Sequence, residues 1–243
     1  MLELAGRRAL VTGAGRRVGA AIALALGRAR MRVGVHHHGS AQGALETCER
    51  IRTAGGQAQA LRADLLDRAE ARSLVDRAVV ELGGLDLLVL SAASFERTPL
   101  HRIDDRAWDQ TLALNLAAPF FMAQRAAEVL RASRGSIVLV TCASRLAPER
   151  DYLAYQLSKA ALHHLMRLLA LELAPEVRVN AVAPGSVLPP ESFGDEQMSA
   201  LLERMPLGAL GSAQDVADAV VHLARSEWLT ATEIVIDGGR SLR

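Results

Sequence analysis

Two side chains in the second half of the chain, Tyr155 and Lys159, have the types and the spacing that proton transfer requires. Both fall in a stretch of helical period over residues 152–174, where a spacing of four places side chains on one face. A free tyrosine has a pKa of about 10, and a neighbouring ammonium would favour the phenolate and bring that pKa closer to neutral pH. Lys159 is the only lysine in the chain, which indicates a need for an ammonium rather than a guanidinium. An incidental Tyr and Lys on a surface helix is the alternative.

A glycine-rich turn near the start of the chain is typical of phosphate binding. Residues 12–19 read Thr-Gly-Ala-Gly-Arg-Arg-Val-Gly, between an expected strand and an expected helix. Glycines let the backbone approach a pyrophosphate, and the helix N-terminus favours its negative charge. A plain strand-to-helix connection is the alternative. The predicted cofactor contacts in this turn are Gly13, Arg16, Arg17, Val18 and Gly19.

The segment after the second expected strand indicates which dinucleotide is bound. It reads His36-His37-His38-Gly39-Ser40 and lacks the Asp or Glu that usually holds the ribose 2′-hydroxyl of NAD. A 2′-phosphate would tolerate His and Ser, so we predict NADP(H), with His36, His38 and Ser40 as contacts. A metal site is a weaker alternative, because adjacent strand residues point to opposite faces and no fourth ligand is evident. A merely polar strand end is another.

Short apolar runs alternate with segments of helical period along the chain. We expect strands at 8–12, 31–36, 58–62, 85–90, 136–141, 177–182 and 233–237, and helices at 17–29, 41–54, 67–82, 108–132, 152–174 and 213–224. Apolar strands separated by helices predict a parallel sheet covered on both faces. The expected fold is α/β, a single doubly wound Rossmann domain with seven parallel strands over residues 1–243. The least regular stretch, 185–211, is a candidate mobile lid.

Charge and composition narrow the classes of function. With 28 basic and 27 acidic residues, the net charge of +1 argues against a nucleic-acid-binding surface. No apolar run of about 18 residues exists, and the opening residues are too charged for a signal peptide, so we expect a soluble, cytoplasmic protein that acts on a small molecule and binds no membrane. Cys48 and Cys142 lie far apart and show no metal-ligand spacing, which fits a reducing compartment.

These motifs together resemble the classical short-chain dehydrogenase/reductase family. The resemblance covers the turn at 12–19, the Tyr155/Lys159 pair, the segment 178–185 and the ending 236–242. Arg17 stands at the middle glycine position of the family's turn, as in the pteridine reductase and dihydromonapterin reductase branch. That branch also has a His-x-His-x-Ser segment, matched here by His36, His38 and Ser40.

The resemblance implies further site residues and an assembly. Asn115 would hold a water that relays protons to the lysine; a polar residue on a solvated helix face is the alternative. Asp64 would face the adenine, and an ordinary helix N-cap is its alternative. The remaining cofactor contacts implied are Leu65, Ser91, Ala92, Ala93, Pro184, Gly185, Ser186 and Val187. A homotetramer is also implied.

The chain departs from the family pattern at two places. Cys142 stands where classical members have a catalytic Ser, and a thiol is the weaker hydrogen-bond donor. Cys142 as a nucleophile is a lesser alternative, since no base is evident nearby. The family's two asparagines after the fourth strand are replaced in Ser91-Ala92-Ala93-Ser94, which casts doubt on rate more than on fold. Phe95 follows, near the aromatic residue that stacks on the pterin in pteridine reductases; a half-buried loop aromatic is its alternative.

The leading hypothesis is an NADPH-dependent reductase of a C=O or C=N bond. A pterin or folate is the first candidate substrate, and a ketone or 3-oxoacyl compound is the second. A dinucleotide-binding sensor with weakened catalysis is the competing class. Cys142 and the missing asparagines favour the sensor, whereas Tyr155, Lys159 and Asn115 oppose it.

Overall fold

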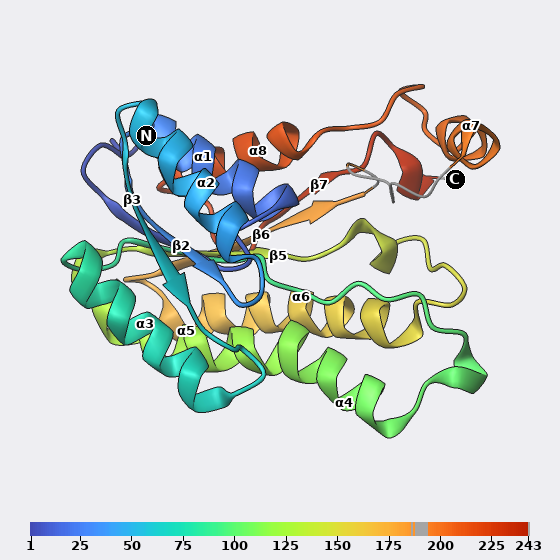
Figure 1. Cartoon of the computed structure of the whole chain (residues 1–243), viewed down its shortest axis with the longest axis horizontal. Helices are drawn as coiled ribbons and strands as arrows, with labels where there is room; N and C mark the ends of the chain where they lie inside the picture. The colour runs from blue at the N-terminus through green and yellow to red at the C-terminus, as the bar shows by residue number, and fades with distance from the viewer. Residues whose placement is uncertain (186, 188–193, 243) are drawn as a thin grey trace.

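The computed structural model describes residues 1–185, 187 and 194–242, and shows one seven-stranded parallel sheet (Figure 1). The strands are β1 (Arg8–Val11), β2 (Arg32–His37), β3 (Gln57–Arg62), β4 (Leu87–Leu90), β5 (Ser136–Val140), β6 (Arg178–Pro184) and β7 (Glu233–Ile236). Their order in the sheet is β3-β2-β1-β4-β5-β6-β7, with every pair parallel. The order reverses between β1 and β4, and ligands of such sheets bind beyond the strand ends at this point.

Helices cover both faces of the sheet (Figure 1). One layer holds α1 (Arg17–Arg28), α2 (Ala41–Thr53) and α8 (Ala213–Arg225); the other holds α3 (Arg68–Leu82), α4 (Asp105–Leu112), α5 (Ala118–Ser133) and α6 (Leu153–Leu173). Alternate residues of β1 enter the two cores, because Leu10 faces the α3, α5 and α6 layer while Ala9 and Val11 face the other. The predicted doubly wound single domain is confirmed.

Side-chain caps fix where several helices begin. The Asp67 carboxylate accepts hydrogen bonds from the amides of Ala69 and Glu70 at the start of α3, and Ser212 forms a capping box with Asp215 at the start of α8. The cap of α3 is therefore Asp67 and not Asp64. Gly83 ends α3 with a φ of 75°, a left-handed conformation that glycine adopts without steric cost.

The single helix predicted over 108–132 is wrong in detail. Helix α4 begins earlier, at Asp105, where Asp104 caps it by accepting from the amide of Ala107. A π-helical turn, Ala113–Ala117, then separates α4 from α5. Such turns are rare and frequently occur at functional sites, and this one contains Asn115.

The stretch 185–211, predicted to be irregular, contains a helix, α7 (Asp195–Glu203). Its first turn carries Asp195 and Glu196, and Gln197 accepts from the amide of Gly194. Acidic groups and such a contact stabilise a helix N-terminus. Residues 186 and 188–193 of the expected lid lie outside the described residues.

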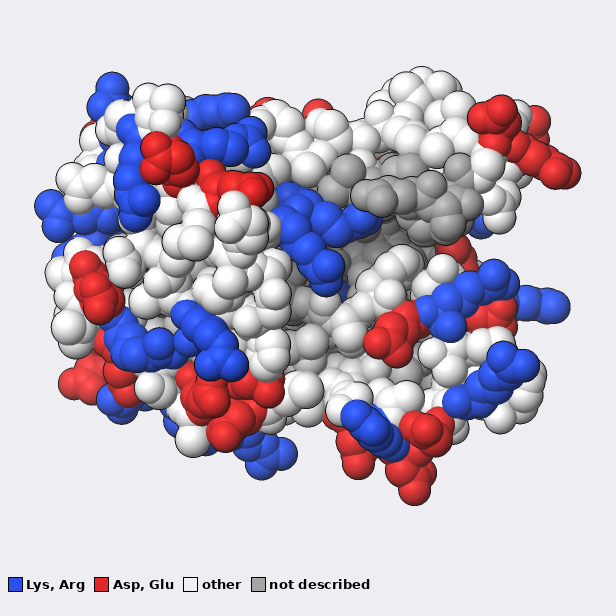
Figure 2. Space-filling view, viewed as in Figure 1, with Lys and Arg blue, Asp and Glu red and all other residues white. Residues whose placement is uncertain are grey.

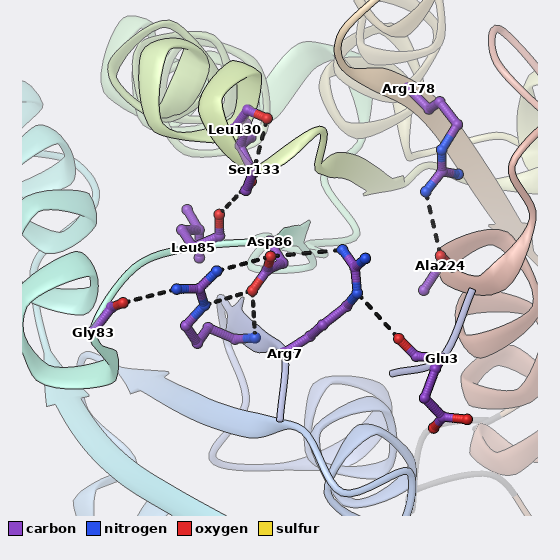
Figure 3. Close-up of polar contacts among 10 residues, drawn as sticks. Glu3, Arg7, Gly83, Leu85, Asp86, Leu130, Ser133, Arg178 and Ala224 are labelled. Carbon is purple, nitrogen blue, oxygen red and sulfur yellow. Dashed lines mark hydrogen bonds and ion pairs between the residues drawn. The ribbon is translucent and has the colours of Figure 1, made fainter. Parts of the chain in front are cut away.

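At the amino ends of the strands, a buried carboxylate organises basic side chains (Figure 3). Asp86 accepts from the Arg8 amide, at 2.8 Å, and from the Arg8 guanidinium through Nε and NH2, at 2.6 and 2.9 Å. Arg7 NH1 lies 3.6 Å from Oδ1 of the same carboxylate. This cluster lies at the sheet end opposite to the predicted site. Among the described residues, no helix has both the length and the apolar character that crossing a bilayer requires.

Candidate active site

The carboxyl ends of β1 and β4 are joined by one hydroxyl. Thr12 Oγ1 is buried and accepts from the amides of Ser91 and Ala92, at 2.9 and 3.0 Å. A Cβ atom on Gly13 would lie 3.0 Å from the Ala92 Cα, so a side chain there would press on the β4 loop. The Ser91–Ala92 backbone is thus held against the glycine-rich turn although both family asparagines are absent.

Tyr155 and Lys159 lie on one side of α6, as their spacing predicts. Lys159 is 2% exposed, and its ammonium donates to the carbonyl of Val140, the last residue of β5, at 2.7 Å. It lies 5.8 Å from the centre of the Tyr155 ring. The structure therefore brings the phenol and the only lysine of the chain together at the carboxyl ends of the strands.

The ionisation of this pair differs in part from the sequence prediction. Burial, the Cys142 charge and a hydrogen bond to Cys142 raise the pKa of the Tyr155 phenol well above its ordinary value. For the chain by itself, desolvation of the phenolate is the largest effect. The lowered pKa, expected from the ammonium together with the positive charge of the oxidised nicotinamide, stays a prediction for the complex with the cofactor. Burial lowers the pKa of Lys159 to about 8, an effect that Cys142 partly opposes. At neutral pH both groups hold their protons.

Cys142, directly after β5, faces Tyr155. Its thiol lies near enough to the Tyr155 hydroxyl to help raise the pKa of that phenol. The Ser144 hydroxyl and amide also approach the Cys142 Sγ, at 3.1 and 3.4 Å. The position that carries a Ser in the resembled family is thus occupied by a partly exposed thiol beside the phenol.

Asn115 is 0% exposed and clamps the loop after β4. Its Oδ1 accepts from the Ser94 amide at 2.9 Å, while Nδ2 donates to the Ser94 carbonyl at 3.1 Å and to Ser158 Oγ at 3.0 Å. The alternative of a solvated polar residue is therefore wrong. These contacts occupy the side chain, so a water in the predicted relay would need the Asn115 backbone rather than its amide group.

Aromatic rings gather beside the phenol. The Phe95 ring stacks on Tyr152, with centroids 4.9 Å apart, and meets Tyr155 edge-on at 4.7 Å. Arg97 pairs with Asp151 at 2.7 Å, which joins the two loops that carry these rings. Phe95 remains 58% exposed, so one side of the ring is available to a flat molecule.

The glycine-rich turn has the close contacts that explain its glycines. A Cβ on Gly19 would lie 2.2 Å from the Gly13 carbonyl oxygen, and one on Gly15 would lie 2.4 Å from Ser40 Oγ. Arg17, at the family's middle glycine position, has a φ of 52° and keeps the left-handed backbone that glycine would adopt. Within the described residues, no acidic side chain lies in the first turn of α1 and none caps it, which leaves this N-terminus suited to an anion.

The buried ring of His36 supports this turn, and both of its ring nitrogens already contact the protein. Its Nδ1 accepts from the Gly13 amide at 3.0 Å, and Nε2 lies 3.2 Å from the Ala63 carbonyl. Burial lowers the pKa of His36 to about 4, against the hydrogen bond to Ala63. The neutral ring therefore carries its proton on Nε2. The prediction of direct phosphate contact by His36 is wrong, because both nitrogens are engaged and the residue is 2% exposed.

His38 and Ser40 remain candidates for contact with the cofactor. His38 is exposed, and its Nδ1 lies 3.3 Å from Oδ1 of Asp64. Asp64 also accepts from the Leu66 amide at 2.9 Å. Arg16 and Arg17 are exposed at the start of α1. Because the only lysine is buried, the basic surface near the middle of Figure 2 is arginine.

The other predicted contacts surround the same strand ends. Leu65 follows β3 and is buried, Val18 lies in the first turn of α1, and Ala93 is exposed after β4. Pro184 ends β6, and Gly185 packs so closely that a Cβ would lie 2.6 Å from Asp237 Cβ. Val187 is buried, whereas Ser186 lies outside the described residues. No described group of three or more His, Cys, Asp or Glu side chains could hold a metal ion.

Several residues that shape the site were not singled out from the sequence. Ser158 contacts Asn115, and Glu233 contacts Thr141, Arg145 and His163 around the Cys142 segment. His163 lies one helical turn after Lys159, a spacing that could have revealed it. Glu233 is separated from Arg145 by 88 positions, so no local pattern joins them.

Comparison with known proteins agrees with this geometry. A family model described as enoyl-(acyl carrier protein) reductase matches residues 13–241. The 3beta-hydroxysteroid dehydrogenase 1 of Eggerthella lenta is 33% identical over 249 residues, covering 99% of this chain and 95% of that protein. The chain belongs to the short-chain dehydrogenase/reductase family.

Other relatives of this short-chain dehydrogenase/reductase extend over the same length. The 3-oxoacyl-[acyl-carrier-protein] reductase FabG of Staphylococcus aureus is 31% identical, covering 96% of this chain and 97% of that protein. The crystal structure of a short chain dehydrogenase from Burkholderia cenocepacia in complex with NADP matches with a TM-score of 0.92 and 35% identity, covering 98% of this chain and 99% of that one. The chain is thus an oxidoreductase of this family.

Proposed function

We propose that this protein is an NADP(H)-dependent reductase that transfers hydride to a C=O or C=N bond of a small molecule. One observation carries the proposal: a protonated phenol, Tyr155, lies beside the buried Lys159 ammonium at the strand ends where the sheet order reverses. Hydride addition leaves negative charge on the acceptor atom, and a phenol at this place can neutralise it.

The residues divide the chemistry among them. A bound nicotinamide cofactor supplies the hydride. Tyr155 donates its proton to the substrate oxygen or nitrogen, and its raised pKa keeps that proton in place until the acceptor becomes basic. The Lys159 ammonium stabilises the phenolate left behind. Cys142 takes the place next to the phenol from which a side chain can orient the Tyr155 hydroxyl.

The preference for NADP(H) rests on charge around the expected 2′-phosphate. Strand β2 ends without a carboxylate, at His37, and the exposed Arg16 and Arg17 stand at the start of α1. The exposed His38 ring lies at the same end of β2, although its partner Asp64 would oppose a phosphate. Two arginines against one paired carboxylate favour the phosphorylated cofactor. The complex of the Burkholderia cenocepacia relative with NADP supports the same assignment.

For the substrate, a flat ring system such as a pterin or folate is our first candidate. The exposed Phe95 ring beside Tyr155 supports it, because aromatic faces stack on planar heterocycles. Arg17 in the turn and the pair His38/Ser40 add the motif resemblance to pteridine reductases. A ketone or 3-oxoacyl substrate is the second candidate, favoured by the names of the relatives from Eggerthella lenta and Staphylococcus aureus.

We also propose a homotetramer. On α6 the exposed leucines Leu153, Leu157, Leu168 and Leu171 follow a helical stripe on the side away from Tyr155. An apolar stripe of this kind is stabilised when a second copy covers it. Light scattering after size exclusion measures the mass, and Leu171→Asp, at a side chain 75% exposed, should reduce the assembly without lowering the helix content.

The test of the proposed function is NADPH oxidation against a panel of pterins, quinones and ketones. We expect turnover with at least one class, a higher kcat/KM for NADPH than for NADH, and a loss of at least about 100-fold in kcat for Tyr155→Phe. Full turnover by the Tyr155→Phe variant would contradict the proposal. Tight NADPH binding without turnover of any substrate class would favour the sensor. The Cys142 thiol and the missing asparagines are the features that support this alternative.

A further inference from the structure

The carboxylate of Glu233, at the start of β7, lies at the centre of a polar cluster behind Cys142. Its side chain is 4% exposed. Thr141 Oγ1 lies 2.7 Å and His163 Nδ1 3.0 Å from its Oε1. Arg145 donates to its Oε2 through Nε, at 2.9 Å, and through NH2.

These contacts join the two parts of the chain that carry the catalytic groups. Thr141 and Arg145 flank Cys142, while His163 lies on α6 one turn beyond Lys159. The Thr141 amide also donates to the Val182 carbonyl of β6 at 2.8 Å. Glu233 therefore touches the Cys142 segment on both sides of the thiol and links it to the helix of Tyr155.

The contacts of Glu233 fix the geometry of this segment more than they add to the stability of the fold. Burial raises the pKa of the Glu233 carboxyl, but hydrogen bonds from Arg145, Thr141 and His163 outweigh burial, so this pKa lies below its ordinary value. A buried ion pair adds little stability compared with well-packed apolar side chains, whereas its hydrogen bonds fix geometry. The short segment 141–145, whose only regular structure is a single 3-10 turn, needs such a constraint.

We propose that Glu233 is a positioning residue of the active site, which holds segment 141–145 against α6 and so fixes the place of the Cys142 thiol beside Tyr155. The inference deepens the proposed function, and its kinetic consequences rest on that function. Its geometric consequence, the placement of the thiol, does not.

The first test measures the thiol directly. The rate of Cys142 alkylation by iodoacetamide is followed in a Cys48→Ala background, in which Cys142 is the remaining cysteine. We expect Glu233→Gln to raise this rate about tenfold, because the neutral amide no longer holds Arg145 and the segment moves away from Tyr155. An unchanged rate would overturn the proposal.

The second test measures turnover. Glu233→Gln should lower kcat about tenfold with the KM for NADPH unchanged within about twofold, since a displacement on the order of 1 Å near the reacting atoms has at least this effect. In a Cys142→Ala background the same substitution should change kcat by less than about twofold. An equal loss in both backgrounds would show that Glu233 does not act through Cys142.

Asp86 provides the matched control. It is a buried carboxylate paired with arginine at the other end of the sheet (Figure 3). Asp86→Asn should destabilise the protein without changing the alkylation rate or kcat. If it changes both as Glu233→Gln does, the effect is general loosening and the inference fails. If alkylation responds as expected while no substrate is turned over, the positioning inference stands and the proposed function fails.

Discussion

The imidazole of His36 accepts a hydrogen bond from the backbone N–H of Gly13 at 3.0 Å, and this bond joins the carboxyl end of β2 to the first glycine of the glycine-rich turn. The other ring nitrogen lies 3.2 Å from the Ala63 carbonyl after β3. One neutral side chain therefore ties three neighbouring strand ends together. The turn that would receive the cofactor phosphates is built on a residue that must remain unprotonated.

Stability should consequently depend on the titration of His36. Its pKa is about 4 in the folded chain, against an ordinary value of 6.5. The unfolded chain binds this proton more readily, so the stabilising contribution is present above pH 6.5 and is lost as pH falls towards about 4, by up to about 3 kcal/mol. Urea unfolding at several pH values measures it. His36→Gln should flatten the slope in this window, and an unchanged slope would contradict the assignment.

Two substitutions of Arg17 separate the effect of its backbone strain on stability from the effect of its charge on cofactor binding. Because φ is 52°, Arg17→Gly should be more stable than Arg17→Ala by about 1 kcal/mol, although both remove the same guanidinium. Both variants should raise the KM for NADPH while leaving the KM for NADH within about twofold. Thermal unfolding and initial rates provide the two measurements. Equal stability of the variants would argue against the left-handed conformation.

Removal of the Asn115 amide should destabilise the loop after β4. Asn115→Ala leaves the Ser94 amide and carbonyl without their side-chain partner, while the Ser158 hydroxyl keeps its bond to the Tyr155 carbonyl; the loss costs about 3 kcal/mol in free energy of unfolding. For a chain of this size the melting temperature should fall by roughly 10 °C. Activity should fall as well, because Ser94 precedes the Phe95 ring that contacts Tyr155. Calorimetry checks the first effect, and a change below about 2 °C would exclude the clamp.

The reductive reaction should slow in alkaline solution through Lys159. Its pKa of about 8 means that the ammonium is present at neutral pH and is lost above about pH 8. We expect kcat/KM for reduction to be constant below that value and to fall tenfold per pH unit above it. Lys159→Arg, whose guanidinium stays charged, should lack this limb whatever its absolute rate. A limb that persists in that variant would belong to another group.

The sequence predicts the sheet and the helix pair because their signals are local. Tyr155 and Lys159 share one helix face, and each glycine of the turn lies where a side chain would collide with a neighbouring atom. Other features depend on contacts between distant segments. The asparagine pair missing after β4 is offset by Thr12, and the segment around Cys142 is held by Glu233 from the last strand.

Burial explains where sequence reasoning about single residues was wrong or incomplete. His36 has a suitable type and place for a phosphate, yet its ring lies beneath the turn. The Tyr155 phenol has an ammonium nearby, yet in the chain by itself desolvation raises its pKa. The π-helical turn at Asn115 interrupts a sequence of uniform helical period. The burial of a single polar side chain such as His36 depends on the packing of distant segments, and the local order of residue types does not predict it.

The buried Lys159 also determines how this protein responds to amine-directed chemistry. Since every other positive side chain is arginine or histidine, a reagent that acylates amines can mark only one side chain, Lys159, besides the α-amino group of Met1. Labelling would then report the opening of the catalytic cleft, and a molecule bound there would suppress it. Once peptide mapping separates it from the α-amino group, labelling of Lys159 provides a chemical readout of occupancy that needs no knowledge of the substrate.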